Sequence, residues 1–283
     1  MKSIREALTK YTELLARSGI EYPRLEVEIL LAHAINQDRV YLFAHQDGII
    51  SGESLNVLRE ACMRRTKREP LAYIIGHKEF YGLDLIVTPE VMIPRPETEL
   101  LVDEVLNLCL GESDSPNLVV AEPGTGSGAI SIALAKQLDN VRIYSSDISA
   151  GALSIAAVNV SKFNVEDKVT LLKGNLLSAL PELPDLIVSN LPYIPSRRIP
   201  FLQPEIDWEP KLALDGGEDG LDLIRHLIHG ARHIETLRDI ILEIDCSQAK
   251  ALKTIVLSEI PTASVEVIKD LSGLDRVISI HIG

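Results

Sequence analysis

Segments typical of β-strands alternate with segments typical of α-helices from residue 118 to the end of the chain. Short runs rich in Val, Ile and Leu alternate with longer stretches whose apolar residues recur at helical spacing. We predict strands at 118–122, 141–146, 169–173, 185–189, 239–243, 264–268 and 276–282, and helices at 128–138, 150–163, 220–236 and 247–258. This alternation predicts an α/β fold, an open parallel sheet with helices on both faces.

The last two predicted strands are connected differently from the others. Only residues 270–275 separate them. A crossover between parallel neighbours needs a dozen or more residues, so we expect these two strands to form an antiparallel pair.

The first 70 residues have the texture of a helical bundle. Apolar residues recur at helical spacing between residues 4 and 35, and short polar breaks divide the segment into four or five helices. From Tyr73 onward, apolar and polar residues alternate around Gly82, as in a β-hairpin. We therefore predict a helical domain at 1–72, a hairpin linker at 73–93 and a sheet domain at 94–283, with a helix-like segment at 97–110 following Pro94 and Pro96.

The charge of the chain is distributed unevenly. The formal net charge is −13, yet the first 75 residues carry 11 Lys and Arg against 10 Asp and Glu, whereas the rest carries 17 against 31. An acidic body repels phosphate backbones, so non-specific nucleic-acid binding by that part is disfavoured. The one basic cluster, residues 64–68, is interpreted as a solvated helix end in preference to a contact with RNA or an acidic partner.

Membrane, disulfide and metal signals are weak in this sequence. No stretch approaches the roughly 18–20 apolar residues of a membrane span, and the N-terminus is charged where a signal peptide is apolar. We therefore expect a cytoplasmic protein. The three cysteines have no paired spacing and are expected to be buried. His226, His229 and His233 fall on the predicted helix 220–236, but a rim of hydrogen-bonded histidines is commoner than a metal site, so no metal is predicted.

A glycine turn follows the first predicted strand of the sheet domain. Gly124, Gly126 and Gly128 alternate with Thr125 and Ser127 before a helix. Glycines allow a tight turn and a close backbone approach, and the free N–H groups of a helix N-terminus favour a negative group.

An acidic residue follows the glycine turn at the end of the next strand. Asp147 comes nineteen residues after Gly128, where its carboxylate can accept both hydroxyls of a ribose. The pairing indicates a cofactor that carries a nucleoside. Spacing alone does not separate NAD from S-adenosylmethionine.

The tetrapeptide Asn190-Leu191-Pro192-Tyr193 follows the fourth predicted strand. It falls beside the glycine turn if the first and fourth strands are neighbours. An amide nitrogen is a poor nucleophile because its lone pair is delocalised. The side-chain oxygen of Asn190 and the backbone carbonyl of Leu191 could accept its two N–H bonds and direct the lone pair toward an electrophilic methyl group. Pro192 would stiffen the loop, and Tyr193 offers a flat face to a planar amide.

Further motifs accompany these two along nearly the whole chain. They lie at 69–76, 80–83, 93–99, 147–149, 213–217, 219–221, 270–273 and 275–276. The most discriminating is Ile93-Pro94-Arg95-Pro96-Glu97-Thr98-Glu99. With these motifs the chain resembles the HemK/PrmC family of protein-(glutamine) methyltransferases, which use S-adenosylmethionine to methylate the glutamine amide of the Gly-Gly-Gln motif in peptide-chain release factors.

The resemblance implies a fold, a site and a partner. The fold is a seven-stranded Rossmann-like class I methyltransferase sheet with an N-terminal helical bundle and a β-hairpin linker. The resemblance implies that the helical domain at 1–72 recognises the substrate and that the domain at 94–283 is the S-adenosylmethionine-dependent methyltransferase domain. The implied partner is a release factor, and the protein is expected to be a monomer without membrane or direct nucleic-acid contact. The catalytic residues are those of the tetrapeptide, which also bind substrate together with Ile93 and Arg95. The implied cofactor-binding residues are Glu122, Gly124, Thr125, Gly126, Ser127, Gly128, Asp147, Asn175, Leu176 and Asn190.

Four positions depart from the usual pattern of the family. Leu191 replaces a proline, but the role at that position belongs to its backbone carbonyl. Glu122-Pro123 stands where an Asp is usual, Asn175 replaces an Asp expected to contact the adenine amine, and Asp245 replaces a glycine. We expect these changes to affect cofactor affinity more than fold.

Three other functions remain open at this point. The tetrapeptide would suit an exocyclic amine of an extruded nucleic-acid base, although the acidic body disfavours it. The departures suit an inactive paralogue that binds the cofactor and a protein partner. NAD-dependent oxidation shares only the glycine turn, and no hydride-relay histidine or tyrosine-lysine pair is recognisable.

Overall fold

The computed structural model describes residues 2–109 and 118–283 and separates into two compact units. The smaller unit comprises Met1–His77 together with Pro204–Trp208, and the larger comprises Lys78–Gln203 together with Glu209–Gly283. The predicted domain limits at residues 72 and 93 stay predictions. The segment Pro204–Trp208 groups with the helices of the smaller unit despite its distance in sequence.

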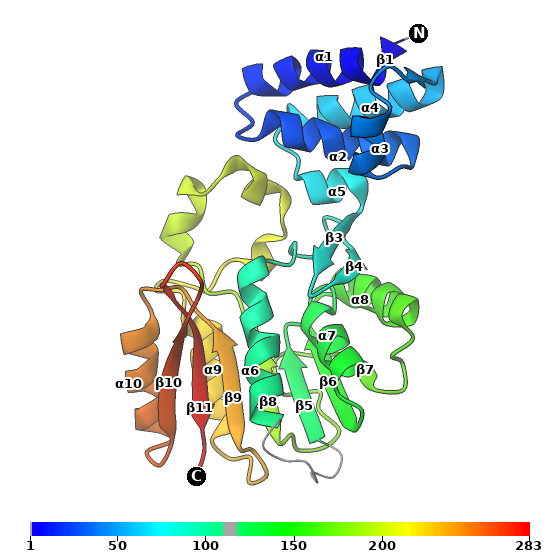
Figure 1. The fold of residues 1–283 in the computed structure, drawn as a ribbon. Helices are drawn as coiled ribbons and strands as arrows, with labels where there is room; N and C mark the ends of the chain where they lie inside the picture. The colour runs from blue at the N-terminus through cyan, green and yellow to red at the C-terminus, as the bar shows by residue number, and fades with distance from the viewer. Residues whose placement is uncertain (1, 110–117) are drawn as a thin grey trace. The chain divides into compact units, whose positions relative to one another are not determined.

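The smaller unit is a helical bundle, as predicted (Figure 1). It contains α1 (Ile4–Arg17), α2 (Pro23–Ile35), α3 (Arg39–Ala44), α4 (Gly52–Arg65) and α5 (Leu71–Ile75), with the two-residue strands β1 (Lys2–Ser3) and β2 (Ile49–Ile50) paired antiparallel. Helix α1 begins with a capping box in which Ser3 and Glu6 satisfy each other's backbone N–H groups. The two short strands were not predicted, because two residues leave no periodicity to detect.

The basic cluster at 64–68 is held by acidic residues of the same unit. Arg65 is 6% exposed and pairs with Glu26 at 2.5 Å and with Glu205 at 2.9 Å. Glu205 belongs to the distant segment Pro204–Trp208 and also pairs with Arg68. The interpretation of this cluster as a solvated helix end is therefore wrong for Arg65, whose charge joins segments far apart in the sequence.

The larger unit begins with a hairpin and continues as alternating strands and helices (Figure 1). Its elements are β3 (His77–Phe80), β4 (Leu83–Ile86), η1 (Pro96–Thr98), α6 (Glu99–Cys109), β5 (Leu118–Pro123), α7 (Ala129–Gln137), β6 (Val141–Asp147), α8 (Ala150–Phe163), β7 (Val169–Lys173), β8 (Leu186–Ser189), η2 (Ser196–Phe201), η4 (Lys211–Ala213), α9 (Asp222–Ala231), β9 (Asp239–Glu243), α10 (Ala249–Glu259), β10 (Ser264–Lys269) and β11 (Asp275–His281), while η3 (Pro204–Trp208) belongs to the smaller unit. The predicted helix at 97–110 begins as η1 and α6, and its last residue lies outside the described residues.

The main sheet has seven strands in the order β10-β11-β9-β8-β5-β6-β7. Strands β9, β8, β5, β6 and β7 are parallel, and β11 pairs antiparallel with both β9 and β10. This confirms the predicted seven-stranded fold and the antiparallel pair. The strand order reverses direction at β5, whose neighbours are β8 and β6, and ligands in open α/β sheets bind at such a point.

The two faces of the sheet carry separate hydrophobic cores. Alternate residues of β8 show the division, since Leu186 and Val188 pack with the core under α6, α7 and α8, whereas Ile187 packs with the core under α9 and α10. Side chains of a strand point to opposite faces in turn, so a strand covered on both sides is apolar throughout. All four residues of β8 are buried for this reason.

The predicted end of one helix is wrong. Helix α9 ends at Ala231 and not at residue 236, because the chain turns there to bring Leu237 into the core before β9, so His233 lies beyond the helix.

Among the described residues, no group of three His, Cys, Asp or Glu side chains could hold a metal ion. The prediction that all three cysteines are buried is correct for Cys62 alone, because Cys109 is half-buried and Cys246 is exposed.

No helix in the described part of the chain is both long and apolar enough to cross a membrane.

Replacing Arg65 with Ala tests the buried ion pairs of the smaller unit. We expect a loss of about 3–5 kcal/mol in the free energy of unfolding, because Glu26 and Glu205 would remain largely buried without their partner. Chemical denaturation measures this. The matched control is Arg17→Ala, whose side chain is 83% exposed and 4.0 Å from Glu13, and which should change stability by no more than about 0.5 kcal/mol. Equal effects of the two substitutions would contradict the assignment.

Candidate functional site

The glycine turn connects β5 to α7 in a backbone conformation that other residues rarely adopt. Gly124, Gly126 and Gly128 have φ angles of 74°, 56° and 82°. The turn is tied to the next strand, since the N–H groups of Gly124 and Thr125 both donate to the carbonyl of Ser146, at 2.7 and 3.1 Å. At Gly126 an added Cβ would meet no other atom within 4 Å, so the backbone there borders open space. The turn can therefore admit a ligand close to its main chain.

Asp147 ends β6, directly beside this turn. Its two carboxylate oxygens accept hydrogen bonds from the N–H groups of Gly126, at 3.0 Å, and of Ser149, at 2.8 Å. These bonds fix the carboxylate in place. Each oxygen has a further lone pair with which it can accept a ligand hydroxyl.

Glu122 is a buried carboxyl beneath the glycine turn. It is 1% exposed and accepts hydrogen bonds from the hydroxyls of Thr125, at 2.7 Å, and Ser145, at 3.0 Å. Burial raises the pKa of Glu122 to about 7, against the lowering effect of these hydroxyls. A positive ligand nearby would favour the charged form of this group.

The tetrapeptide follows β8, which pairs directly with β5 through Val120 with Leu186 and Ala121 with Ile187. The glycine turn and the tetrapeptide therefore leave the sheet from neighbouring strand ends. The side-chain nitrogen of Asn190 donates to the hydroxyl of Thr98 at 3.0 Å.

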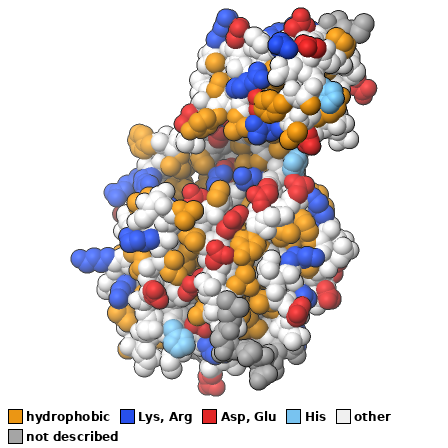
Figure 2. All heavy atoms as spheres, in the orientation of Figure 1, with side chains coloured by type: hydrophobic (Ala, Val, Ile, Leu, Met, Phe, Trp, Pro, Cys, Tyr) orange, Lys and Arg blue, Asp and Glu red, His pale blue; other side chains and the backbone are white. Residues whose placement is uncertain are grey.

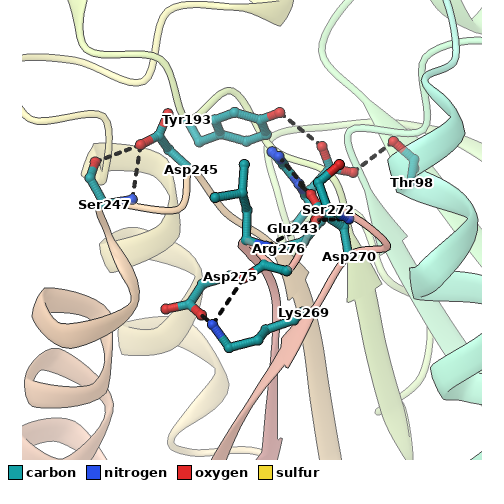
Figure 3. Close-up of polar contacts among 12 residues, drawn as sticks. Thr98, Tyr193, Glu243, Asp245, Ser247, Lys269, Asp270, Ser272, Asp275 and Arg276 are labelled. Atoms are coloured by element: carbon teal, nitrogen blue, oxygen red, sulfur yellow. Dashed lines mark hydrogen bonds and ion pairs between the residues drawn. The ribbon is translucent and has the colours of Figure 1, made fainter.

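Glu243, at the end of β9, collects two further hydrogen bonds at this place. Its carboxylate accepts from the hydroxyl of Thr98 at 2.6 Å and from that of Tyr193 at 2.8 Å. Figure 3 shows Thr98 and Tyr193 converging on Glu243 from opposite sides. Burial raises the pKa of Tyr193, and the neighbouring Glu243 raises it further, so the phenol keeps its proton.

A cavity of about 290 Å³ lies over these strand ends, entirely within the larger unit. The predicted residues that line it are Glu122, Gly124, Thr125, Gly126, Ser127, Asp147, Asn175, Leu176, Asn190, Leu191 and Pro192. Glu90 adds a third carboxyl, and no Lys, Arg or His is among the described residues that line it. The cavity therefore suits a ligand with a positive charge and polar hydroxyls.

Four predicted residues are not part of the cavity wall. Gly128 is the N-cap residue of α7, the hydroxyl of Tyr193 donates to Glu243, and Ile93 is buried at the start of the proline-rich motif. Arg95 forms an ion pair with the buried Glu209, which also accepts from the N–H of Ile93 at 3.1 Å. Their predicted roles toward cofactor and substrate stay predictions.

The chain matches two described protein families. Residues 6–76 match the PrmC N-terminal domain, and residues 98–199 match the methyltransferase small domain. A release factor glutamine methyltransferase from Moorella thermoacetica is 39% identical over 97% of this chain and 96% of its own length, and one from Geobacter sulfurreducens is 39% identical over 99% and 97%. The chain belongs to the release factor glutamine methyltransferase family.

Solved structures show the same fold at low sequence identity. The N-terminal domain of human METTL16 in complex with SAH has a TM-score of 0.54 at 15% identity, covering 95% of this chain and 94% of that one. A methyltransferase from Pyrococcus furiosus has a TM-score of 0.52 at 19% identity, covering 73% and 92%. These similarities establish the class I methyltransferase fold for the chain.

Two residues of the site were missed as functional residues in the sequence. Thr98 lies in the proline-rich motif shared with the family and is 4% exposed, and Glu243 ends a strand next to β8. A usable signal existed for Glu243, because polar residues at the carboxyl ends of central parallel strands gather at one edge. Thr98 gives no such signal, because its proximity to Asn190 depends on a contact between residues 92 positions apart.

The departures from the family pattern have visible local consequences. The side chain of Leu191 packs over the glycine turn, 3.2 Å from where a Cβ on Gly124 would lie. Asn175 lines the cavity next to Leu176, which has a positive φ of 50°. Asp245 pairs with Arg198 at 2.8 Å, which ties the loop after the tetrapeptide to the end of β9.

A Glu122→Gln variant tests the raised pKa of this buried carboxyl. The fold favours protonated Glu122, so the stability it contributes is present below the ordinary pKa of 4.5 and is lost as the pH rises through about 7. Relative to the variant, the wild type should lose about 3 kcal/mol of unfolding free energy between these pH values. Urea denaturation from pH 4.5 to 8 measures it.

The exposed Glu13 supplies the control for this experiment. Its side chain is 64% exposed, and Glu13→Gln should leave the shape of the stability curve unchanged. Parallel curves for the wild type and Glu122→Gln would show that Glu122 titrates alike in the folded and unfolded chain, contrary to our expectation.

Proposed function

We propose that this protein transfers a methyl group from S-adenosylmethionine to the side-chain amide nitrogen of the glutamine in the Gly-Gly-Gln motif of peptide-chain release factors. The observation that supports this most directly is the amide of Asn190, held at the wall of an acidic cavity by a hydrogen bond to Thr98. The full-length similarity to release factor glutamine methyltransferases supports the same substrate.

The residues present fit the proposed cofactor. Gly126 leaves open space beside its backbone, Asp147 has free lone pairs for ribose hydroxyls, and Asn175 and Leu176 line the same cavity. The three carboxyls of the wall complement the positive sulfonium. When bound, this cofactor supplies an electrophilic methyl group on a good leaving group.

The chain's own residues would position the nucleophile. The side-chain oxygen of Asn190 and the carbonyl of Leu191 accept the two N–H bonds of the substrate amide, which orients its nitrogen lone pair and stabilises the positive charge that develops there. The buried Leu191 and the stiff Pro192 exclude water from this position. The methylated nitrogen loses its extra proton to solvent water after transfer, so no strong base is needed.

Substrate residues outside the cavity are assigned as proposals. Arg95, held by Glu209, and the ring of Tyr193 would contact the residues around the glutamine. The helical unit would bind the body of the release factor. Its exposed apolar side chains support a protein-binding role, since Val40 is 73%, Tyr22 62% and Ile49 61% exposed.

A nucleic-acid amine is the second candidate substrate, and the charge of the chain disfavours it. On the face drawn in Figure 2, Lys and Arg side chains are interspersed with Asp and Glu. A protein that follows a phosphate backbone usually presents a continuous basic surface. Since release factors act on ribosomes, we place the protein in the cytoplasm, and we propose that it acts as a monomer without direct nucleic-acid contact.

The proposed reaction is tested by incubating the protein with methyl-labelled S-adenosylmethionine and a release factor. We expect one methyl group on the glutamine of the Gly-Gly-Gln motif, located by mass spectrometry. Asn190→Ala should lower kcat on the order of 100-fold or more, because one of the two acceptors for the substrate amide is lost. Cofactor affinity, measured by calorimetry, should change less than threefold.

Two controls separate the alternatives. A release factor with Gln→Glu in the motif should accept no label, and DNA or RNA should accept none at any salt concentration. Tight cofactor binding without label on the release factor would instead support an inactive paralogue, and label on nucleic acid would support the base-modifying alternative.

A further inference from the structure

The hydrogen bonds around Thr98 have a fixed direction. A threonine hydroxyl has one hydrogen to donate and lone pairs to accept with. At 2.6 Å from a carboxylate oxygen of Glu243, the Thr98 hydroxyl donates its hydrogen there. It can then only accept from Asn190, so the atom of Asn190 that faces it must be the amide nitrogen and not the oxygen.

The carboxylate of Glu243 sets this direction because both its oxygens act as acceptors. One accepts from Thr98 and the other from Tyr193. Burial and the neighbouring Glu97 raise the pKa of Glu243, whereas these two hydroxyls and the nearby positive charge of Arg276 lower it. Arg276 is itself held by Asp270 at 3.1 Å, as Figure 3 shows.

The wider surroundings leave the direction intact. Glu243 is 1% exposed, and Thr98, which also lines the cavity, is 4% exposed, so both groups are buried. A buried carboxylate costs free energy unless its acceptors are satisfied. The buried carboxyl of Glu243 at the end of β9, which accepts from Thr98 and Tyr193, is explained by a role toward the tetrapeptide.

We propose that Thr98 and Glu243 are positioning residues that fix the orientation of the Asn190 amide. When the side-chain nitrogen of Asn190 faces Thr98, the side-chain oxygen of Asn190 is left free of that contact. This oxygen then accepts a hydrogen bond from the substrate amide. The site then selects a group that carries N–H, and discriminates against a carboxylate of the same shape. This inference rests on the proposed function, because it concerns the same substrate amide.

The hydroxyl of Thr98 is tested with an isosteric pair of variants. Thr98→Val removes the hydroxyl at nearly constant volume, and we expect kcat to fall about 10–100-fold because the Asn190 amide is then free to rotate. Thr98→Ser keeps the hydroxyl and should recover activity to within about threefold. The Kd for S-adenosylmethionine should stay within about threefold of the wild type in both, which also shows that each variant is folded.

A double-mutant cycle separates positioning from a general structural role. If Thr98 acts through Asn190, Thr98→Val should cost less than about twofold in an Asn190→Ala background. Single-turnover assays at high enzyme concentration measure the slow variants. Additive losses would overturn the inference, as would a Thr98→Val enzyme as fast as the wild type.

Competition between two release factors for the enzyme provides a second readout, which compares their binding and does not depend on kcat. A release factor with Gln→Glu in the motif should compete poorly against the natural factor for the wild-type enzyme. Thr98→Val should reduce this preference at least about threefold, because its Asn190 can turn its nitrogen toward the carboxylate. An unchanged preference would contradict the proposed role.

The control variant for Glu243 lies on the same strand. Glu243→Leu should reproduce the loss of kcat seen with Thr98→Val, whereas Asp239→Asn, at the opposite end of β9 and paired with His281 at 3.0 Å, should leave kcat unchanged. If the wild type places no label on the glutamine, the proposed function itself fails. If the wild type does label the glutamine and Thr98→Val is as fast as the wild type, only the present inference fails.

Discussion

The pairing of β5 with β8 is the contact on which the site depends. It joins residues about 66 positions apart, Val120 with Leu186 and Ala121 with Ile187, in the middle of the sheet. Because the two strands are parallel, the glycine turn and the tetrapeptide leave them at the same edge. The proposed cofactor contacts at the turn and the proposed substrate contacts at Asn190 therefore lie at neighbouring strand ends. The cores on both faces keep this pairing rigid, since every residue of β8 is buried.

The two buried carboxyls of the site follow one physical scheme. Glu122 lies one residue before the end of β5 and Glu243 ends β9, each is 1% exposed, and each accepts hydrogen bonds from two hydroxyls. Burial raises the pKa of both, so each costs stability in its charged form. A sheet built for stability alone would have apolar residues at these positions. Their presence fits the proposed roles of the site, a cationic ligand in the cavity lined by Glu122 and an amide oriented through Glu243.

Much of this arrangement could be predicted from local sequence. Strand and helix periods predicted the seven strands, and glycine spacing with Asp147 predicted a nucleoside site, because these features depend on neighbours along the chain. The bond from Thr98 to Asn190 could not be predicted, nor could the ion pair of Arg65 with Glu205, because both are long-range contacts fixed only by the fold. The end of α9 was misjudged because apolar spacing continues past Ala231, while the need to bury Leu237 turns the chain earlier.

The uneven charge of the chain takes on a specific meaning in the structure. The arginines of the basic cluster near residue 65 form ion pairs with Glu26, Glu69 and Glu205 inside the smaller unit. Little of their positive charge is therefore left for an acidic partner. The acidic excess includes the carboxyls of the cavity, where it complements a cation. A phosphate backbone would therefore find no free basic cluster in the smaller unit. At the cavity it would meet negative carboxyls. A protein loop with a neutral amide avoids both penalties, because the proposed recognition by Asn190 requires hydrogen-bond donors and no charge.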